Sequence, residues 1–111
     1  MEFQDLIRRA TEVRAQYSAL ERARYGRAWT TEELMLGFLG DVGDLAKLVV
    51  AHGGVREIPD ASAKLAHELA DCLWSILVLA QRLDVDLEDA FFETMDDLER
   101  HIQSLRQGGG T

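Results

Sequence analysis

The chain has 111 residues, 47% hydrophobic and 29% charged, which is the balance of a single globular domain. Its net charge of −8 argues against binding of nucleic acid through the phosphate backbone, because such binding requires a basic surface. For the same reason, a small molecule that carries phosphate would need metal ions to supply positive charge. No apolar run approaches the ~20 residues that span a bilayer, and the first residues lack a signal-peptide pattern. The single cysteine, Cys72, excludes an internal disulfide. We therefore expect a cytoplasmic protein.

The spacing of apolar residues predicts four helices and no strand. The first helix covers roughly residues 2–24 and ends before Gly26. The second begins after Thr30, which forms the pattern of a capping box with Glu33, and it runs to about residue 51.

The third helix is predicted to start after Asp60 or Ser62 and to end near Leu83. It is apolar nearly all round, which indicates a second buried face, most simply a subunit interface. Asp86 caps a fourth helix that runs to about residue 105. We expect its apolar side chains to face inward; they are Phe91, Met95, Leu98, Ile102 and Leu105.

These elements predict an all-α fold, a four-helix bundle-like protomer over residues 1–107 followed by a flexible glycine-rich tail over residues 108–111. Small helical domains often gain stability by associating. We therefore expect a homo-oligomer, either a dimer or a dimer-based tetramer.

Two pairs of acidic residues lie inside apolar helical runs: Asp41 with Asp44, and Glu68 with Asp71. Spacing of i and i+3 puts both carboxylates of a pair on one helix face, and antiparallel packing would let the pairs face each other across ~8–10 Å. Carboxylates near a core lose hydration and repel one another, and a hard cation with oxygen ligands offsets that cost. The four residues therefore predict a Mg2+ site, with Mn2+ as the alternative ion.

Two other interpretations of these acids exist. A di-iron carboxylate centre needs Glu-x-x-His on two helices, and none of His52, His67 or His101 has a Glu three residues before it. Solvated surface charges are the other interpretation, which the apolar surroundings of both pairs disfavour.

Three stretches then carry a resemblance: GDVGDLAK at residues 40–47, ELADCLW at 68–74 and LDVDLEDA at 83–90. Together they resemble the MazG-like all-α nucleotide pyrophosphohydrolases over roughly residues 29–100. The resemblance implies Mg2+-dependent hydrolysis of a (d)NTP to the monophosphate and pyrophosphate. It also implies that Asp41, Asp44, Glu68 and Asp71 are the metal ligands and catalytic residues.

The nucleotide itself would need further contacts. The resemblance favours Lys47 and Arg100 as phosphate ligands, with a helix lysine that extends into solvent as the alternative for Lys47. Trp29 and Trp74 are candidate surfaces for stacking on a base. Core packing is the better interpretation of Trp74, which leaves Trp29 as the predicted substrate-binding tryptophan.

The chain departs from the family pattern E-E-x-x-E. Gly40 replaces the first Glu, and the next two acids are the shorter Asp41 and Asp44. Gly37, Gly40 and Gly43 permit a close helix approach, which would compensate for the shorter reach. On the last helix, where relatives carry basic residues and Asn, this chain has Thr94, Asp97 and Leu98. The alternative function is therefore a non-catalytic relative that binds metal, nucleotide or a protein partner; a helical oligomerisation module without any ligand ranks last.

Overall fold

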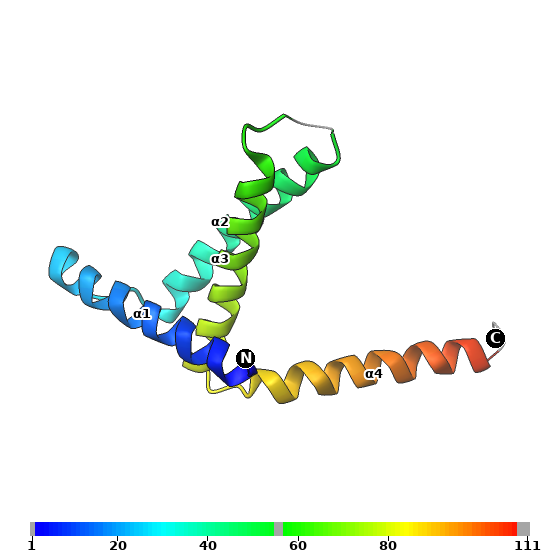
Figure 1. The fold of residues 1–111 in the computed structure, drawn as a ribbon. Helices are drawn as coiled ribbons and strands as arrows, with labels where there is room; N and C mark the ends of the chain where they lie inside the picture. The colour runs from blue at the N-terminus through cyan, green and yellow to red at the C-terminus, as the bar shows by residue number, and fades with distance from the viewer. Residues whose placement is uncertain (1, 55–56, 109–111) are drawn as a thin grey trace.

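The computed structural model describes residues 2–54 and 57–108. They form four helices, α1 (Phe3–Tyr25), α2 (Thr31–His52), α3 (Ala61–Arg82) and α4 (Leu87–Gln107), which confirms the all-α prediction (Figure 1). Of the tail predicted over residues 108–111, only Gly108 is described; its backbone N–H donates to Ser104 O at the end of α4. None of these helices has a stretch whose length and hydropathy would let it cross a membrane.

The helices α2 and α3 form an antiparallel hairpin, and α1 lies across α3 near the end of that hairpin (Figure 1). The core forms at this crossing, where Ala10, Leu77 and Val78 are buried. Trp74 packs against them, and its Nε1 donates a hydrogen bond to Ala10 O at 3.0 Å. Trp74 is therefore a core residue, as its place in the apolar third helix predicts.

The start of α2 is fixed by the predicted capping box. Thr30 Oγ1 accepts a hydrogen bond from Glu33 N at 3.2 Å, and the Glu33 carboxylate accepts one from Thr30 N at 2.9 Å. Arg27 donates two further hydrogen bonds to that carboxylate, at 2.7 and 2.9 Å. These bonds are the largest cause of the lowering of the pKa of Glu33 to about 2. The local sequence Arg27 to Glu33 thus sets where α2 begins.

A buried ion pair joins α1 to the residue that precedes this cap. Arg14 and Glu21 are each 7% exposed and form a salt bridge within α1. Glu21 also accepts a hydrogen bond from the backbone N–H of Trp29 at 3.0 Å, while Arg82 donates to Trp29 O at 3.2 Å. Burial by itself raises the pKa of Glu21, but the bonds from Trp29 and Arg14 more than offset it and the pKa is lowered. The backbone of Trp29, just before α2, is thus held from both α1 and α3.

Substitution Arg14→Ala should lower the free energy of unfolding by about 3 kcal/mol, because it leaves the Glu21 carboxylate buried without its cation. Urea denaturation followed by circular dichroism measures the change. Arg9→Ala is the matched control, since Arg9 pairs with Glu12 on the exposed face of the same helix and should cost less than about 1 kcal/mol. Equal losses of unfolding free energy in both variants would contradict the role of Arg14 and Glu21 as a buried ion pair.

Helix α4 extends away from the other three helices and buries none of its residues (Figure 1). Gln4 Nε2 donates to Glu88 Oε1 at 3.2 Å, which ties only the first turn of α4 to α1. After α3, the backbone at Asp84 adopts a left-handed conformation with a φ of 57°. The chain therefore turns away from the hairpin at this residue. The expectation that the apolar face of α4 is buried within the same chain is therefore wrong.

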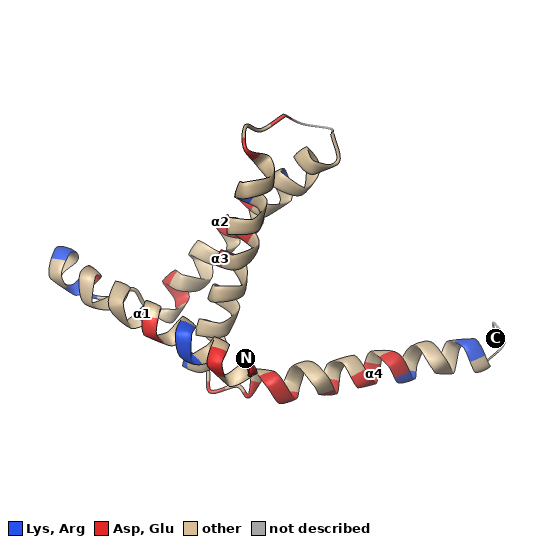
Figure 2. Ribbon diagram, viewed as in Figure 1, with Lys and Arg blue, Asp and Glu red and all other residues tan. Residues whose placement is uncertain are grey.

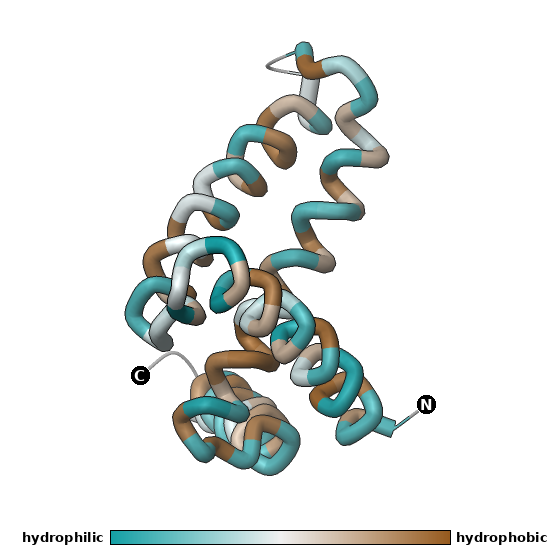
Figure 3. Tube along the Cα trace, turned by 90° about the vertical axis from the view of Figure 1, so that its left-hand side faces the viewer, coloured by the Kyte–Doolittle hydropathy of each residue, from teal (hydrophilic) through white to brown (hydrophobic). Residues whose placement is uncertain are grey.

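The apolar face of α4 is consequently exposed, with Leu105, for example, 60% accessible. Apolar residues recur along this helix as along the others, and acidic residues are prominent on it (Figures 2 and 3). On α3, Leu69, Leu73 and Ile76 are also exposed, by 53%, 48% and 40%. These are two apolar surfaces that nothing covers within the described part of a single chain.

Candidate metal centre

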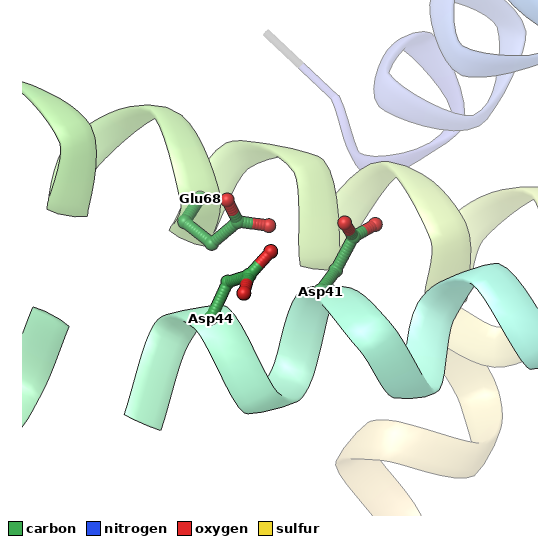
Figure 4. A group of neighbouring side chains, drawn as sticks. All are labelled: Asp41, Asp44 and Glu68. Atoms are coloured by element: carbon green, nitrogen blue, oxygen red, sulfur yellow. The ribbon is translucent and has the colours of Figure 1, made fainter. Parts of the chain in front are cut away.

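The hairpin of α2 and α3 brings three of the four predicted metal ligands together. Asp41 and Asp44 lie one turn apart on α2, and Glu68 faces them from α3 (Figure 4). One carboxylate oxygen from each residue lies within 4.8 Å of the other two. Spacing of i and i+3 aligns the two aspartates on one face of α2, and the antiparallel neighbour supplies the third carboxylate.

Asp71 stands beside this group rather than in it. Its Oδ2 lies 3.1 Å from Nε2 of His67, which is four residues earlier on α3. Its charge still contributes to raising the pKa of Glu68. The structure therefore places Asp71 next to the three acids and pairs it with an imidazole that the sequence analysis left without a role.

Among the three clustered acids, Glu68 has the environment that most disfavours its charged form. Its Oε1 is buried and has no hydrogen-bond partner among the described residues. Burial, followed by the negative charge of Asp41 and then by those of Asp71 and Asp44, raises its pKa above the ordinary value. A cation bound beside a desolvated carboxylate among like charges stabilises its ionised form. The cluster thus fits a divalent ion, which takes several oxygen ligands from carboxylates and water.

The glycines of α2 do not mediate the close helix approach that the sequence suggested. A Cβ added at Gly40 or Gly43 would meet nothing within 4 Å, and one at Gly37 would meet only the ring of Trp29, at 4.0 Å. The position where the family pattern has its first Glu is therefore open space in this chain.

An open pocket of about 520 Å3 adjoins the cluster on the side of the α2–α3 connection. Asp44 and Glu68 belong to both the cluster and the pocket wall. The remaining lining residues are Lys47, Leu48, Ile58, Asp60, Ala63, Lys64 and His67. A pocket of this size lies in the range of small-molecule sites.

Of the predicted substrate-binding residues, only Lys47 lines this pocket. Trp29 is 44% exposed and borders a separate pocket along α1, together with Tyr25 of α1 and Trp74 of α3. Arg100 lies on the exposed side of α4 and pairs with Asp97. Lys64 also lines the pocket, and its position four residues before Glu68 puts both on one face of α3.

Cys72 lies one residue after Asp71 and is buried, as expected of a core thiol. Burial and then the charge of Glu68 raise its pKa. The thiol is therefore neutral near pH 7 and does not compete with the carboxylates for a hard cation.

These features define an all-α protein whose successive antiparallel helices direct carboxylates into one site beside a pocket. The family model of the MazG nucleotide pyrophosphohydrolase domain matches residues 29–103, and the chain belongs to that family. The match includes α2 and α3 entirely and most of α4, whereas α1 precedes it. No curated protein and no solved structure matches the chain.

In the absence of metal, Glu68→Gln should make the protein more stable than the parent at pH 7. Because the folded-state pKa of Glu68 is raised, its ionisation destabilises the fold as pH rises above the ordinary value of 4.5, and the penalty is absent below it. The gain in Tm should therefore disappear as pH falls below about 4.5. Thermal melts in chelator from pH 4 to 8 measure it.

Exposed Glu93→Gln on α4 removes the same charge and serves as the control, with no such pH-dependent gain expected. Millimolar Mn2+ or Mg2+ should reverse the order, raising the Tm of the parent but not that of Glu68→Gln. If the order of the two melting temperatures is the same with and without metal, the assignment of a metal site to these acids is contradicted.

Proposed function

We propose that this protein is a Mg2+-dependent nucleotide pyrophosphohydrolase that converts a (d)NTP to the monophosphate and pyrophosphate, with Mn2+ able to replace Mg2+. The observation that carries the proposal is the convergence of Asp41, Asp44 and Glu68 in a chain of the MazG family. The adjoining pocket supports it, because a nucleotide needs space beside the metal ligands.

In this proposal the four acids have distinct positions. Asp41 and Glu68, both half-buried, supply oxygens from opposite helices, and exposed Asp44 meets the mouth of the pocket. Asp71, held by His67, adds a carboxylate one turn further along α3. A divalent ion held there supplies positive charge for phosphate oxygens and lowers the pKa of the attacking water.

Purified protein with Mg2+ should release pyrophosphate from at least one nucleotide in a panel of (d)NTPs. Asp44→Asn and Glu68→Gln should each reduce the rate by about 100-fold or more, because the ion is lost and with it the charge stabilisation of the phosphate oxygens. A coupled pyrophosphate assay measures both, with Glu93→Gln as the control of equal charge change. Absence of turnover with Mg2+ and Mn2+ across the panel would overturn the proposal.

A second candidate function is a non-catalytic relative that binds metal and nucleotide without turnover. The empty space at Gly40 and the absence of basic side chains at Thr94 and Leu98 favour it. It predicts calorimetric binding of a nucleotide without product. Because a side chain at position 40 meets nothing within 4 Å, Gly40→Glu should fold normally, and a gain of activity in that variant would support this candidate.

We also propose that the protein is a homodimer or a dimer-based tetramer in which another copy covers the apolar face of α4. Most helices in proteins depend on packing of an apolar face, and that of α4 is exposed in the single chain. Trp29 and Arg100 do not line the pocket of their own chain, so a contribution from them to it would come from another copy.

Leu98→Glu should shift the protein toward the monomer, because it places a charge in the centre of the apolar face of α4. Sedimentation velocity at several concentrations measures the change. Glu99→Gln alters the neighbouring residue and is the control, with no shift expected. A parent protein that is monomeric at high micromolar concentration would contradict the proposed assembly.

A further inference from the structure

The imidazole of His67 is the only nitrogen base in the described part of the chain that lies within ion-pair distance of a predicted metal ligand. Its Nε2 is 3.1 Å from Oδ2 of Asp71, four residues later on α3. The proposed function uses carboxylate oxygens alone and gives this nitrogen no task beyond holding Asp71. A nitrogen donor beside a carboxylate has metal chemistry of its own, which differs from that of the carboxylate cluster.

The two donor atoms have the separation of ligands that share one ion. Zinc lies about 2.0–2.2 Å from an imidazole nitrogen or a carboxylate oxygen, so two such ligands of one ion are about 2.9–3.4 Å apart. The observed 3.1 Å falls inside that range. Spacing of i and i+4 on one helix face is also the arrangement in which paired histidines hold zinc on a helix. Zinc can therefore bind between His67 and Asp71 without movement of α3.

The surroundings of the pair favour a divalent cation. Asp71 adds its negative charge to those of the clustered acids around Glu68. No lysine or arginine among the described residues forms an ion pair with any of these acids. The side chains of His67 and Asp71 are 75% and 35% exposed, which leaves space for water molecules as the remaining ligands of an ion.

This pair and the carboxylate cluster suit different ions. The cluster of Asp41, Asp44 and Glu68 offers oxygen alone, which suits a hard ion such as Mg2+. An imidazole nitrogen favours Zn2+ instead, and Mn2+ is among the first-row ions that such a ligand set binds most weakly. The neighbouring thiol of Cys72 is buried and its pKa is raised, so it does not offer a thiolate to the zinc.

We propose that His67 and Asp71 form a second metal site, beside the carboxylate cluster, which binds Zn2+ through one imidazole nitrogen and one carboxylate oxygen, with water as the remaining ligands. The proposal goes beyond the proposed function, which uses carboxylate ligands for Mg2+, and it does not require that any nucleotide is hydrolysed. His67 also lines the pocket next to the cluster, so zinc bound to it lies at the pocket wall.

Calorimetry with zinc chloride, in a buffer that does not bind zinc, tests the site on the full chain. The starting protein is Glu68→Gln, in which the cluster is weakened and the pair is intact. It should bind Zn2+, and the further change His67→Gln should weaken that binding by at least about tenfold, the lower end of the loss when a residue that supports a metal site is removed. In the parent, His67→Gln should leave the affinity for Mg2+ unchanged, because Mg2+ takes oxygen ligands.

The matched control is His101→Gln in the same Glu68→Gln protein. His101 is an exposed imidazole on α4 with an aspartate four residues before it, but that aspartate, Asp97, pairs with Arg100. The control should leave the affinity for Zn2+ unchanged. If His101→Gln weakens zinc binding as much as His67→Gln does, the zinc is bound adventitiously and the proposal is overturned.

A second measurement uses the parent protein and so does not depend on the folding of a variant. Nuclear magnetic resonance of histidine labelled with nitrogen-15 reports each imidazole nitrogen. Zn2+ should shift the resonance of Nε2 of His67, the nitrogen that faces Asp71, and leave both nitrogens of His101 in place. Equal shifts at the two histidines, absence of zinc binding, or zinc binding that is lost in Cys72→Ala would each overturn the proposal.

Discussion

The packing of α2 against α3 is the contact on which the site depends. It forces carboxylates from Asp41, Asp44 and Glu68 within 4.8 Å of one another, although like charges in a partly desolvated place repel. The same packing creates the pocket at the end of the hairpin and brings Lys47 and Lys64 into it. Under the proposed function, metal binding and the stability of the hairpin are therefore thermodynamically linked.

The remainder of the fold holds this hairpin in place from one end. Helix α1 crosses α3 at the core, and the buried pair of Arg14 and Glu21 contacts the backbone at Trp29, just before α2 begins. A charged network in that position fixes the start of α2 by specific hydrogen bonds. The opposite end of the hairpin carries the pocket, and among the described residues none from α1 or α4 lines it. The buried ion pair and the pocket thus lie toward opposite ends of the hairpin, with the carboxylate cluster between them.

The sequence predicted the features that depend on local periodicity and capping. Helix bounds, the Thr30–Glu33 box and the cap at Asp86 follow from short-range hydrogen bonds, and the convergence of Asp41, Asp44 and Glu68 follows from helical spacing plus antiparallel packing. Features that depend on tertiary direction were missed. The pattern of α4 is the same whether its apolar face meets its own chain or another, and the turn at Asp84 decides between them.

The position of α4 has a consequence for how the chain completes its folding. Under the proposed assembly, the apolar face of a 21-residue helix finds its cover only in a second chain. Formation of α4 and association are then a single equilibrium, and the helix content of the protein obeys mass action. At high dilution the hairpin and α1 would persist while α4 frays. The abundance of the protein would then set how much of it is fully folded.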